Sequence, residues 1–431
     1  MTSDEIATSA GPVTERERVR SLDVLRGVAV LGIFVLNSRN FALPLNEFDN
    51  PAFPEKPAKA IDLWVWAIEN TLFEDKMIAI FSTLFGAGIV VAAERAARPA
   101  WTHYKRMFWL LLIGLLHAFG LWYGDILNTY ALCGFVLYPL RRLPPGLAIG
   151  LGVVVLTVAV WARVGPPMTN SVWPKPPEQT AAAAPVESRS DRIWRESLEG
   201  EAAAYHGTWW EQAVWRAKLN EVWHWHGVYS FNFWRCAGFM LVGMGLMKLG
   251  VLSAGRSSGT YWGMVLCGYG VGFALFALGF WPMLARALGH GIEMGPGARR
   301  VVSLSGWTLR YLSAGGIALG HVGVVMLLCR VRALEHVLTP LAAVGRMALT
   351  NYIAQTVVAV IVFDPWAMGR WGTWRMSEIA TLVVAVWLVQ LIISPIWLRF
   401  MRFGPLEWAW RSLTYGRVQP MRRTDAIPAA T

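Results

Sequence analysis

The amino-acid sequence predicts an all-α polytopic membrane protein of about ten transmembrane helices, with both termini in the cytoplasm. Hydrophobic residues make up 55% of the 431-residue chain and charged residues only 16%, whereas about a quarter of a typical soluble domain is charged. The apolar runs are close to the roughly 20 residues that a helix needs to cross a bilayer. No strand-like alternation organises them, so we expect helices rather than a barrel.

Polar segments divide the predicted helices into two halves. The predicted spans are 22–41, a second ending near 93 after the amphipathic lead-in IDLWVWAIEN, then 104–123, 126–140, 146–163, 229–249, 260–284, 303–328, 342–363 and 378–400. The predicted parts are a disordered cytoplasmic tail (1–20), an N-terminal five-helix half (21–163), an external loop with an interfacial helix (164–228), a C-terminal five-helix half (229–415) and a second cytoplasmic tail (416–431).

The distribution of basic residues predicts the orientation. Loops assigned to the inside carry about twice as many Lys and Arg residues as the short outside loops, which is the pattern of the positive-inside rule. The same rule accounts for the formal net charge of +11, so we expect no nucleic-acid partner. The four cysteines lie in separate apolar runs at unrelated spacings, so neither a disulfide framework nor a zinc site is expected.

The long insertion combines a Pro/Ala-rich connector with a tryptophan-rich helical segment. The second part, WRESLEGEAAAYHGTWWEQAVWRAKLNEVWHWHG, interleaves Trp with charge, which suits a helix lying at the outer membrane interface. A lid over an external acceptor site is the alternative. His206, His224 and His226 lack an accompanying carboxylate pattern, so we expect no metal.

The first predicted helix carries charge in apolar surroundings. Asp23 and Arg26 lie within it, and charge at membrane depth costs roughly 2.5–3.5 kcal/mol per residue on insertion scales. Such residues usually face a protein interior or a wet cavity. Arg26 and Asn37 are separated by nearly three helical turns, so they share a face. The alternative is an Asp23–Arg26 pair that snorkels to the cytoplasmic surface and helps to set orientation.

The third and fourth spans supply the predicted reactive group. His117 lies near the outer end of the third span, and Asp125 lies in the short turn before the fourth. A histidine exchanges protons near neutral pH, and a nearby carboxylate would orient it. The alternative is a histidine that only links helices by a hydrogen bond. His321, in the apolar run IALGHVGVV, has the same ambiguity in a less polar setting.

The ninth span begins with a polar face on the cytoplasmic side. In GRMALTNYIAQT, Arg346 and Thr350 are one turn apart, and so are Asn351 and Gln355. Tyr352 directly follows Asn351. Arg346 and Arg26 together predict a seat for the phosphates of a cytoplasmic ligand; the alternative for Arg346 is a positive-inside anchor. Further candidates are Lys76, at the start of the second span, and Glu407, after the last.

Several motifs in fixed order resemble the YeiB-type family, whose C-terminal half is the DUF418 domain. They are RSLDVLRGVAVLGIFVLN, LFGAG, HAFGLWYGDIL, GRMALTNY and GPLEWAWR, and the resemblance covers residues 18–415. The LDxLRG pattern of the first helix is also similar to that of the wider transmembrane acyltransferase superfamily, which includes the acyltransferase-3 proteins and the heparan-glucosaminide acetyltransferases. This resemblance implies a bacterial cytoplasmic membrane protein.

Those acyltransferases transfer an acyl group from cytoplasmic acyl-CoA to an acceptor, and Asp23 and Arg26 match their motif. The acyltransferase-3 proteins have a histidine eleven residues after the motif arginine, whereas this chain has Asn37, as the heparan-glucosaminide branch does. That branch has a histidine shortly after the first helix, and the corresponding stretch ALPLNEFDNPAF has none. The resemblance therefore implies a base elsewhere, and His117 is the expected replacement.

The leading hypothesis from the sequence is a membrane acyltransferase. Acyl-CoA is its expected co-substrate, with phosphates near Arg26 and Arg346, His117 as general base, Asp125 as its orienting partner and Asn37 as an oxyanion donor. The acceptor would be a hydroxyl or amine of a small molecule, glycan or lipid; membrane lipids are expected partners, and a homo-oligomer is left open. The alternatives are a small-molecule or lipid transporter or flippase that uses the same polar cavity, and a scaffold without turnover.

Overall fold

The protein is all-helical, as the sequence predicts. The computed structural model describes residues 20–54, 58–95, 98–172, 189–221 and 231–423. Within these ranges the one extended pairing is an isolated antiparallel bridge between Met401 and Arg422. The helices are α2 (Arg20–Ala42), α3 (Ala60–Leu72), α4 (Lys76–Arg95), α5 (Pro99–Gly120), α6 (Leu127–Leu137), α7 (Pro145–Val172), α9 (Arg189–Ala204), α10 (Trp209–Asn220), α12 (Asn232–Lys248), α13 (Ser258–Ala287), α14 (Pro296–Arg330), α15 (Glu335–Arg346), α16 (Ala348–Phe363), α17 (Met376–Phe400) and α18 (Pro405–Tyr415), with short 3-10 turns at Tyr138–Arg142 and Arg332–Leu334.

Six of the described helical segments are long and apolar enough to cross a membrane. They are Arg20–Ala42, Ala60–Glu94, Pro145–Gly165, Ser258–Ala287, Pro296–Arg330 and Met376–Phe400, and the bent pair α15–α16 makes a seventh if it is one span. The other predicted spans do form helices, but α6 has 11 residues, about 16 Å at 1.5 Å per residue. That is roughly half of a hydrocarbon core.

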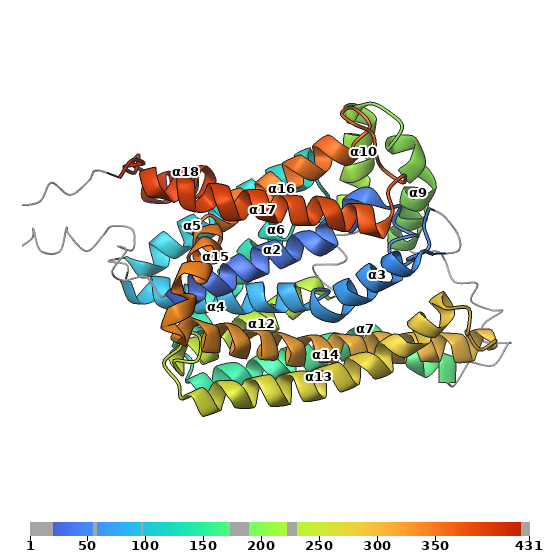
Figure 1. Ribbon diagram of the computed structural model, residues 1–431, viewed down its shortest axis with the longest axis horizontal. Helices are drawn as coiled ribbons and strands as arrows, with labels where there is room; N and C mark the ends of the chain where they lie inside the picture. The colour runs from blue at the N-terminus through green and yellow to red at the C-terminus, as the bar shows by residue number, and fades with distance from the viewer. Residues whose placement is uncertain (1–19, 55–57, 96–97, 173–188, 222–230, 424–431) are drawn as a thin grey trace, which may run out of the picture.

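Helix α2 occupies the centre of the bundle (Figure 1). Most of its residues are buried, and it packs against α4, α14, α15, α16 and α17. A helix that is apolar around most of its circumference has to be surrounded in this way. On one side of the bundle, α13 and α14 run side by side, with α7 and α12 next to them (Figure 1). The described ends of the chain, Arg20 and Arg423, lie at the same end of the bundle, which we call the chain-end face.

Two helix breaks interrupt the bundle. Between α3 and α4, residues 73–75 leave the helix and Asp75 adopts a φ of 60°. Between α15 and α16 the axis turns by 78° at Met347. Breaks of this kind expose backbone groups that need new partners.

The predicted insertion folds into α9 and α10 at the end opposite the chain-end face (Figure 1). Helix α10 begins with a capping box between Thr208 and Glu211. The side chains of Arg216 and Asn220 donate hydrogen bonds to the carbonyls of Gly120 (3.2 Å) and Ala118 (2.9 Å), at the end of α5. Helix α7 continues through Val172, so the first residues assigned to the insertion are helical, and residues 173–188 lie outside the described part of the chain. The predictions for Trp223, Trp225, His224 and His226 lie outside the described residues.

Candidate functional site

A cavity of ≈ 230 Å³ lies among α2, α4, α5, α6, α15, α16 and α18, and we call it the central cavity. Apolar side chains from α2, α4, α5 and α6 form most of its wall, among them Val30, Ile33, Phe81, Leu110 and Leu127. Its polar wall residues include four arginines from four helices, one glutamate and one histidine: Arg26, Arg106, Arg346, Arg411, Glu407 and His103. Guanidinium groups together with apolar walls suit a ligand that has both an anionic group and an apolar part.

The two residues of the predicted polar stripe on α2 differ in position: Arg26 lines the central cavity and Asn37 does not. Arg26, Val30 and Ile33 all line the central cavity, as residues on one helical face should. Asn37 lies one turn beyond Ile33 but is not among the lining residues. Asp23 accepts a hydrogen bond from the Arg26 guanidinium at 2.8 Å, so the two predicted charges form a pair beside the cavity.

Glu407 touches the central cavity and also caps a helix. Its carboxylate accepts hydrogen bonds from the backbone N–H groups of Leu349 (2.6 Å) and Thr350 (3.1 Å) and from the Thr350 hydroxyl (2.6 Å). A carboxylate at a helix N-terminus satisfies free N–H groups and interacts favourably with the helix dipole. Burial nevertheless raises the pKa of Glu407 above its ordinary value. This residue therefore fixes the start of α16 after the sharp bend.

His117 and Asp125 are in direct contact, which the sequence alone could not show. His117 Nδ1 lies 2.8 Å from Asp125 Oδ1, and its Nε2 lies 2.9 Å from the Thr356 hydroxyl. The second Asp125 oxygen accepts the Asn128 N–H at 2.9 Å, so the carboxylate also caps α6. The side chains of His117, Asp125 and Thr356 are all buried. A histidine with a carboxylate on one nitrogen and a hydroxyl on the other has the bonding pattern of an oriented base.

Tyr352 lies next to His117 and also lines the central cavity. Its ring lines the cavity and its centroid lies 5.3 Å from that of the His117 imidazole. His117 itself does not line the cavity, whereas His103 does, with its Nε2 2.9 Å from the Gly134 carbonyl. Asn351 serves packing instead: its amide donates to the Val344 carbonyl and to the Ser394 hydroxyl, both at 3.1 Å.

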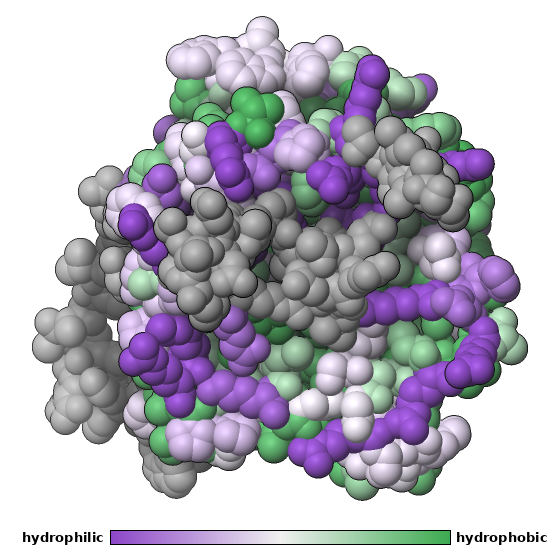
Figure 2. All heavy atoms as spheres, turned by 90° about the vertical axis from the view of Figure 1, so that its left-hand side faces the viewer, coloured by the Kyte–Doolittle hydropathy of each residue, from purple (hydrophilic) through white to green (hydrophobic). Residues whose placement is uncertain are grey.

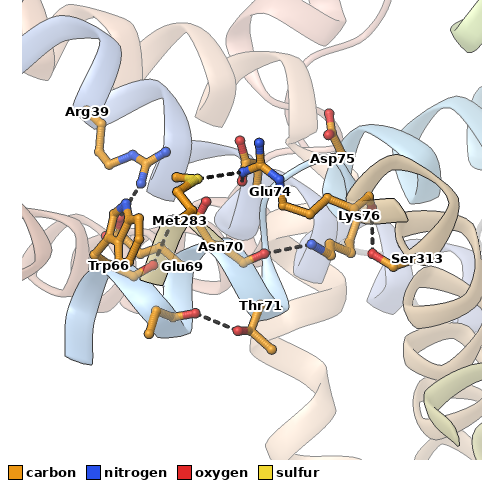
Figure 3. Close-up of polar contacts among 12 residues, drawn as sticks. Arg39, Trp66, Glu69, Asn70, Thr71, Glu74, Asp75, Lys76, Met283 and Ser313 are labelled. Carbon is orange, nitrogen blue, oxygen red and sulfur yellow. Dashed lines mark hydrogen bonds and ion pairs between the residues drawn. The ribbon is translucent and has the colours of Figure 1, made fainter. Parts of the chain in front are cut away.

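Lys76 belongs to a different group of charges, at the break between α3 and α4 (Figure 3). Its ammonium donates to the Asn70 carbonyl at 2.6 Å and lies 4.6 Å from the centre of the Phe276 ring. Arg39 and Glu69 lie nearby as a buried ion pair at 3.5 Å, and Glu74 is 4.0 Å from Arg310. Lys76, a further candidate from the sequence, does not line the central cavity, whereas Arg26 and Arg346 do.

Arg39 is unusual within this group. Its side chain is fully buried, and none of its three nitrogens makes a hydrogen bond within the described part of the chain. Its guanidinium stacks over the Phe48 ring at 4.1 Å. The side-chain atoms Trp66 Nε1, Glu69 Oε2 and Asn70 Oδ1 also lack hydrogen-bond partners among the described residues. Buried polar atoms of this kind usually bind water or another molecule.

The sequence analysis did not single out several residues of the central cavity and of the charged group at the α3–α4 break. Arg411 stands in the motif GPLEWAWR that gave Glu407, and Arg106 begins the third apolar run. Arg39 and Glu69 are each charged residues within or beside apolar runs, which is the signal that singled out Asp23 and Arg26. Thr356 carries no such signal, because a threonine in an apolar helix commonly bonds only its own backbone.

The fold and the cavity define the class of protein: an all-helical membrane protein with a basic, largely apolar cavity between its helices. A family model described as "Protein of unknown function (DUF418)" matches residues 246–417. The chain is 30% identical to "Uncharacterized protein YeiB" of Escherichia coli (strain K12) over 416 residues, covering 94% of this chain and 98% of that protein. It is 28% identical to "Uncharacterized protein YxaH" of Bacillus subtilis (strain 168), covering 97% of this chain and all of the relative. The chain therefore belongs to the YeiB-like DUF418 family.

Proposed function

We propose that this protein is an integral membrane acyltransferase that uses cytoplasmic acyl-CoA. The observation that carries the proposal is the composition of the central cavity: arginines from four helices meet an apolar wall. The phosphates of coenzyme A would bind near Arg26 and Arg346, as expected from the sequence, and also near Arg106 and Arg411. The acyl arm would lie against the apolar side chains of α2 and α4, toward Tyr352.

The chain-end face lies in the cytoplasm in this proposal, and the protein spans the bacterial inner membrane. The support is the excess of Lys and Arg residues in the loops assigned to that side. In this proposal the helices α5, α6 and α12 complete ten membrane-embedded segments.

The proposed chemistry is a single acyl transfer. An acceptor hydroxyl or amine attacks the thioester carbonyl, the bond from carbon to sulfur breaks, and the proton of the acceptor passes to His117 Nε2 and then to the departing thiolate. Asp125 stabilises the charged imidazole from the other side. His117 does not line the cavity, so in this proposal the ring of Tyr352, which lines the cavity next to His117, moves before the acceptor reaches the base.

The first experiment measures coenzyme A binding to the full-length protein in detergent. We expect saturable binding that Arg106→Gln or Arg411→Gln weakens by about tenfold, since a charge-assisted hydrogen bond contributes roughly 1.5–3 kcal/mol. Arg402→Gln is the matched control, because Arg402 is exposed and does not line the cavity. Absence of saturable binding would refute the proposal.

The second experiment separates the two histidines, with release of coenzyme A from acetyl-CoA in native membranes as the measured activity. We expect His117→Gln to lose the activity while retaining coenzyme A binding. Unchanged activity in a well-folded His117→Gln variant, together with loss in His103→Gln, would assign the base to the cavity-lining histidine instead.

A transporter is the second candidate, and the α3–α4 break favours it. Broken helices with ionisable side chains at the break are common at substrate and ion sites of secondary transporters. Glu74 and Asp75 lie within this break, and Glu69 and Lys76 lie on either side of it. A transporter of an unrelated solute should bind no coenzyme A, so the first experiment also distinguishes the two functions.

A further inference from the structure

A second cavity, of ≈ 480 Å³, opens at the chain-end face, and we call it the basic cavity. It lies between the start of α2, the helix α15, the end of α17 and the C-terminal segment that follows α18. Figure 2 views this end of the molecule and shows hydrophilic side chains gathered over it, with hydrophobic residues between them. The basic cavity shares Arg346 with the central cavity.

The charge of the basic cavity is strongly positive. Its lining includes Arg20, Arg346, Arg399 and Arg423, and Asp23 is the one acidic side chain among the described lining residues. Asp23 is already bound to Arg26 at 2.8 Å. Arg20 forms an ion pair with Glu335, which is not among the lining residues. The lining still carries more arginines than acidic side chains, so an anion among these arginines would be stabilising.

Backbone pairing brings Arg423 to this place. The C-terminal segment folds back along the residues after α17, where the Arg402 N–H donates to the Met421 carbonyl at 2.8 Å and the Arg423 N–H donates to the Phe400 carbonyl at 3.0 Å. These bonds fix Arg423 opposite the end of α17, which carries Arg399. The segment therefore holds Arg423 on the wall of the cavity that Arg399 also lines.

The surface next to Arg399 is apolar and suited to lipid chains. Ile392 and Ile396 on α17 are 59% and 55% exposed, and Arg399 is seven residues after Ile392, so the three residues lie on one face of the helix. Phe400 beside them is 61% exposed. In a membrane-spanning helix, such a stripe contacts hydrocarbon, and an arginine at its end reaches the headgroup level.

We propose that the basic cavity binds the headgroup of an anionic phospholipid from the leaflet at the chain-end face. The phosphodiester contacts Arg399 and Arg423, and the acyl chains lie along the exposed stripe of α17. Basic pockets between transmembrane helices recognise anionic headgroups in this manner. The proposal requires only that the protein is in a membrane and does not depend on acyl transfer.

The test uses the full-length protein, purified in dodecyl maltoside, and native mass spectrometry to titrate bound lipid. The probe is phosphatidylglycerol, and phosphatidylcholine with the same chains, inorganic phosphate and coenzyme A are the comparisons. The test variant is Arg399→Gln/Arg423→Gln. The matched control is Arg402→Gln/Arg422→Gln, which removes the same charge from exposed neighbours in the same two segments that do not line the cavity.

We expect one saturable phosphatidylglycerol molecule on the wild type and on the control. The test variant should bind it roughly 20- to 30-fold more weakly, because each basic residue near an anionic lipid contributes about fivefold. Arg399→Lys, which retains the charge, should keep most of the binding and shows that the fold is intact. Equal weakening in both double variants, or equal binding of phosphatidylcholine, would overturn the proposal. Displacement of the lipid by inorganic phosphate or coenzyme A would assign the cavity to a soluble anion instead.

Discussion

Gly27 of α2 and Gly345 of α15 lie in direct backbone contact. A Cβ atom on Gly345 would lie 2.7 Å from the Gly27 nitrogen and would overlap the Asp23 carbonyl oxygen, and one on Gly27 would overlap the Leu341 carbonyl oxygen. This contact allows the two helices to approach closely. It places Arg26, which precedes Gly27, and Arg346, which follows Gly345, on the wall of one cavity.

We predict that Gly345→Ala destabilises the protein and weakens anion binding in the central cavity. The added methyl group forces α2 and α15 apart, and overpacking of this kind typically costs about 1–3 kcal/mol. The thermal unfolding midpoint in detergent should fall by several degrees. Gly263→Ala is the control, because no atom lies within 4 Å of the added Cβ; an equal fall in that variant would contradict the packing argument.

Glu407→Ala should destabilise the start of α16. The substitution leaves two backbone N–H groups and the Thr350 hydroxyl without their shared acceptor, at a cost of about 1–3 kcal/mol. Hydrogen exchange of the first turn of α16 is the measurement, and it should become faster. Glu293→Ala, at an exposed loop position, should change nothing, and protection of α16 that survives in Glu407→Ala would show that the bend is held by other contacts.

The stability of the segment formed by α9 and α10 should depend on pH, because the carboxyl group of Glu201 on α9 is buried. Burial raises the pKa of this carboxyl to about 7, and the hydrogen bond from the Leu45 N–H opposes the shift. Because the folded-state pKa lies above the unfolded one, the stabilisation is fully present below about pH 4.5 and is lost as the pH rises through about 7. Relative to Glu201→Gln, the wild type should lose up to about 3 kcal/mol between about pH 4 and pH 8.

Thermal unfolding of the wild type and of Glu201→Gln at both pH values gives this difference. Glu211→Gln is a control of opposite sign, because hydrogen bonds from Thr208 lower the pKa of Glu211. Its contribution is therefore present at high pH and is lost on acidification. A stability difference that is the same at both pH values, or that favours the wild type at the higher pH, would show that the pKa of Glu201 is not raised in the folded protein.

Substitutions at the buried pair Arg39–Glu69 should change the free energy of unfolding in a strongly non-additive way. Glu69→Leu alone leaves the Arg39 charge buried without its partner, at a cost of about 3–5 kcal/mol. The double variant Arg39→Met/Glu69→Leu replaces both charges by apolar groups of similar size and should be markedly more stable than either single variant. The unfolding midpoints of the wild type, the two single variants Arg39→Met and Glu69→Leu, and the double variant measure the interaction between the two side chains. Additive losses would show that the two side chains do not interact.

The sequence by itself determined the helical membrane class, the family resemblance and most of the helix positions, because each depends on local composition and short motifs. It also identified Arg26, Arg346, His117 and Asp125 as related polar residues, since charge or histidine in an apolar run is conspicuous. Only the tertiary structure decided that His117 contacts Asp125 and Thr356 and does not line the central cavity, whereas the adjacent Tyr352 does. Only the structure placed Lys76 with Arg39 and Glu69, and Arg423 beside Arg399. The physical reason is that these contacts join helices distant in sequence, and their register is set by close backbone packing such as that of Gly27 on Gly345, which no local pattern encodes.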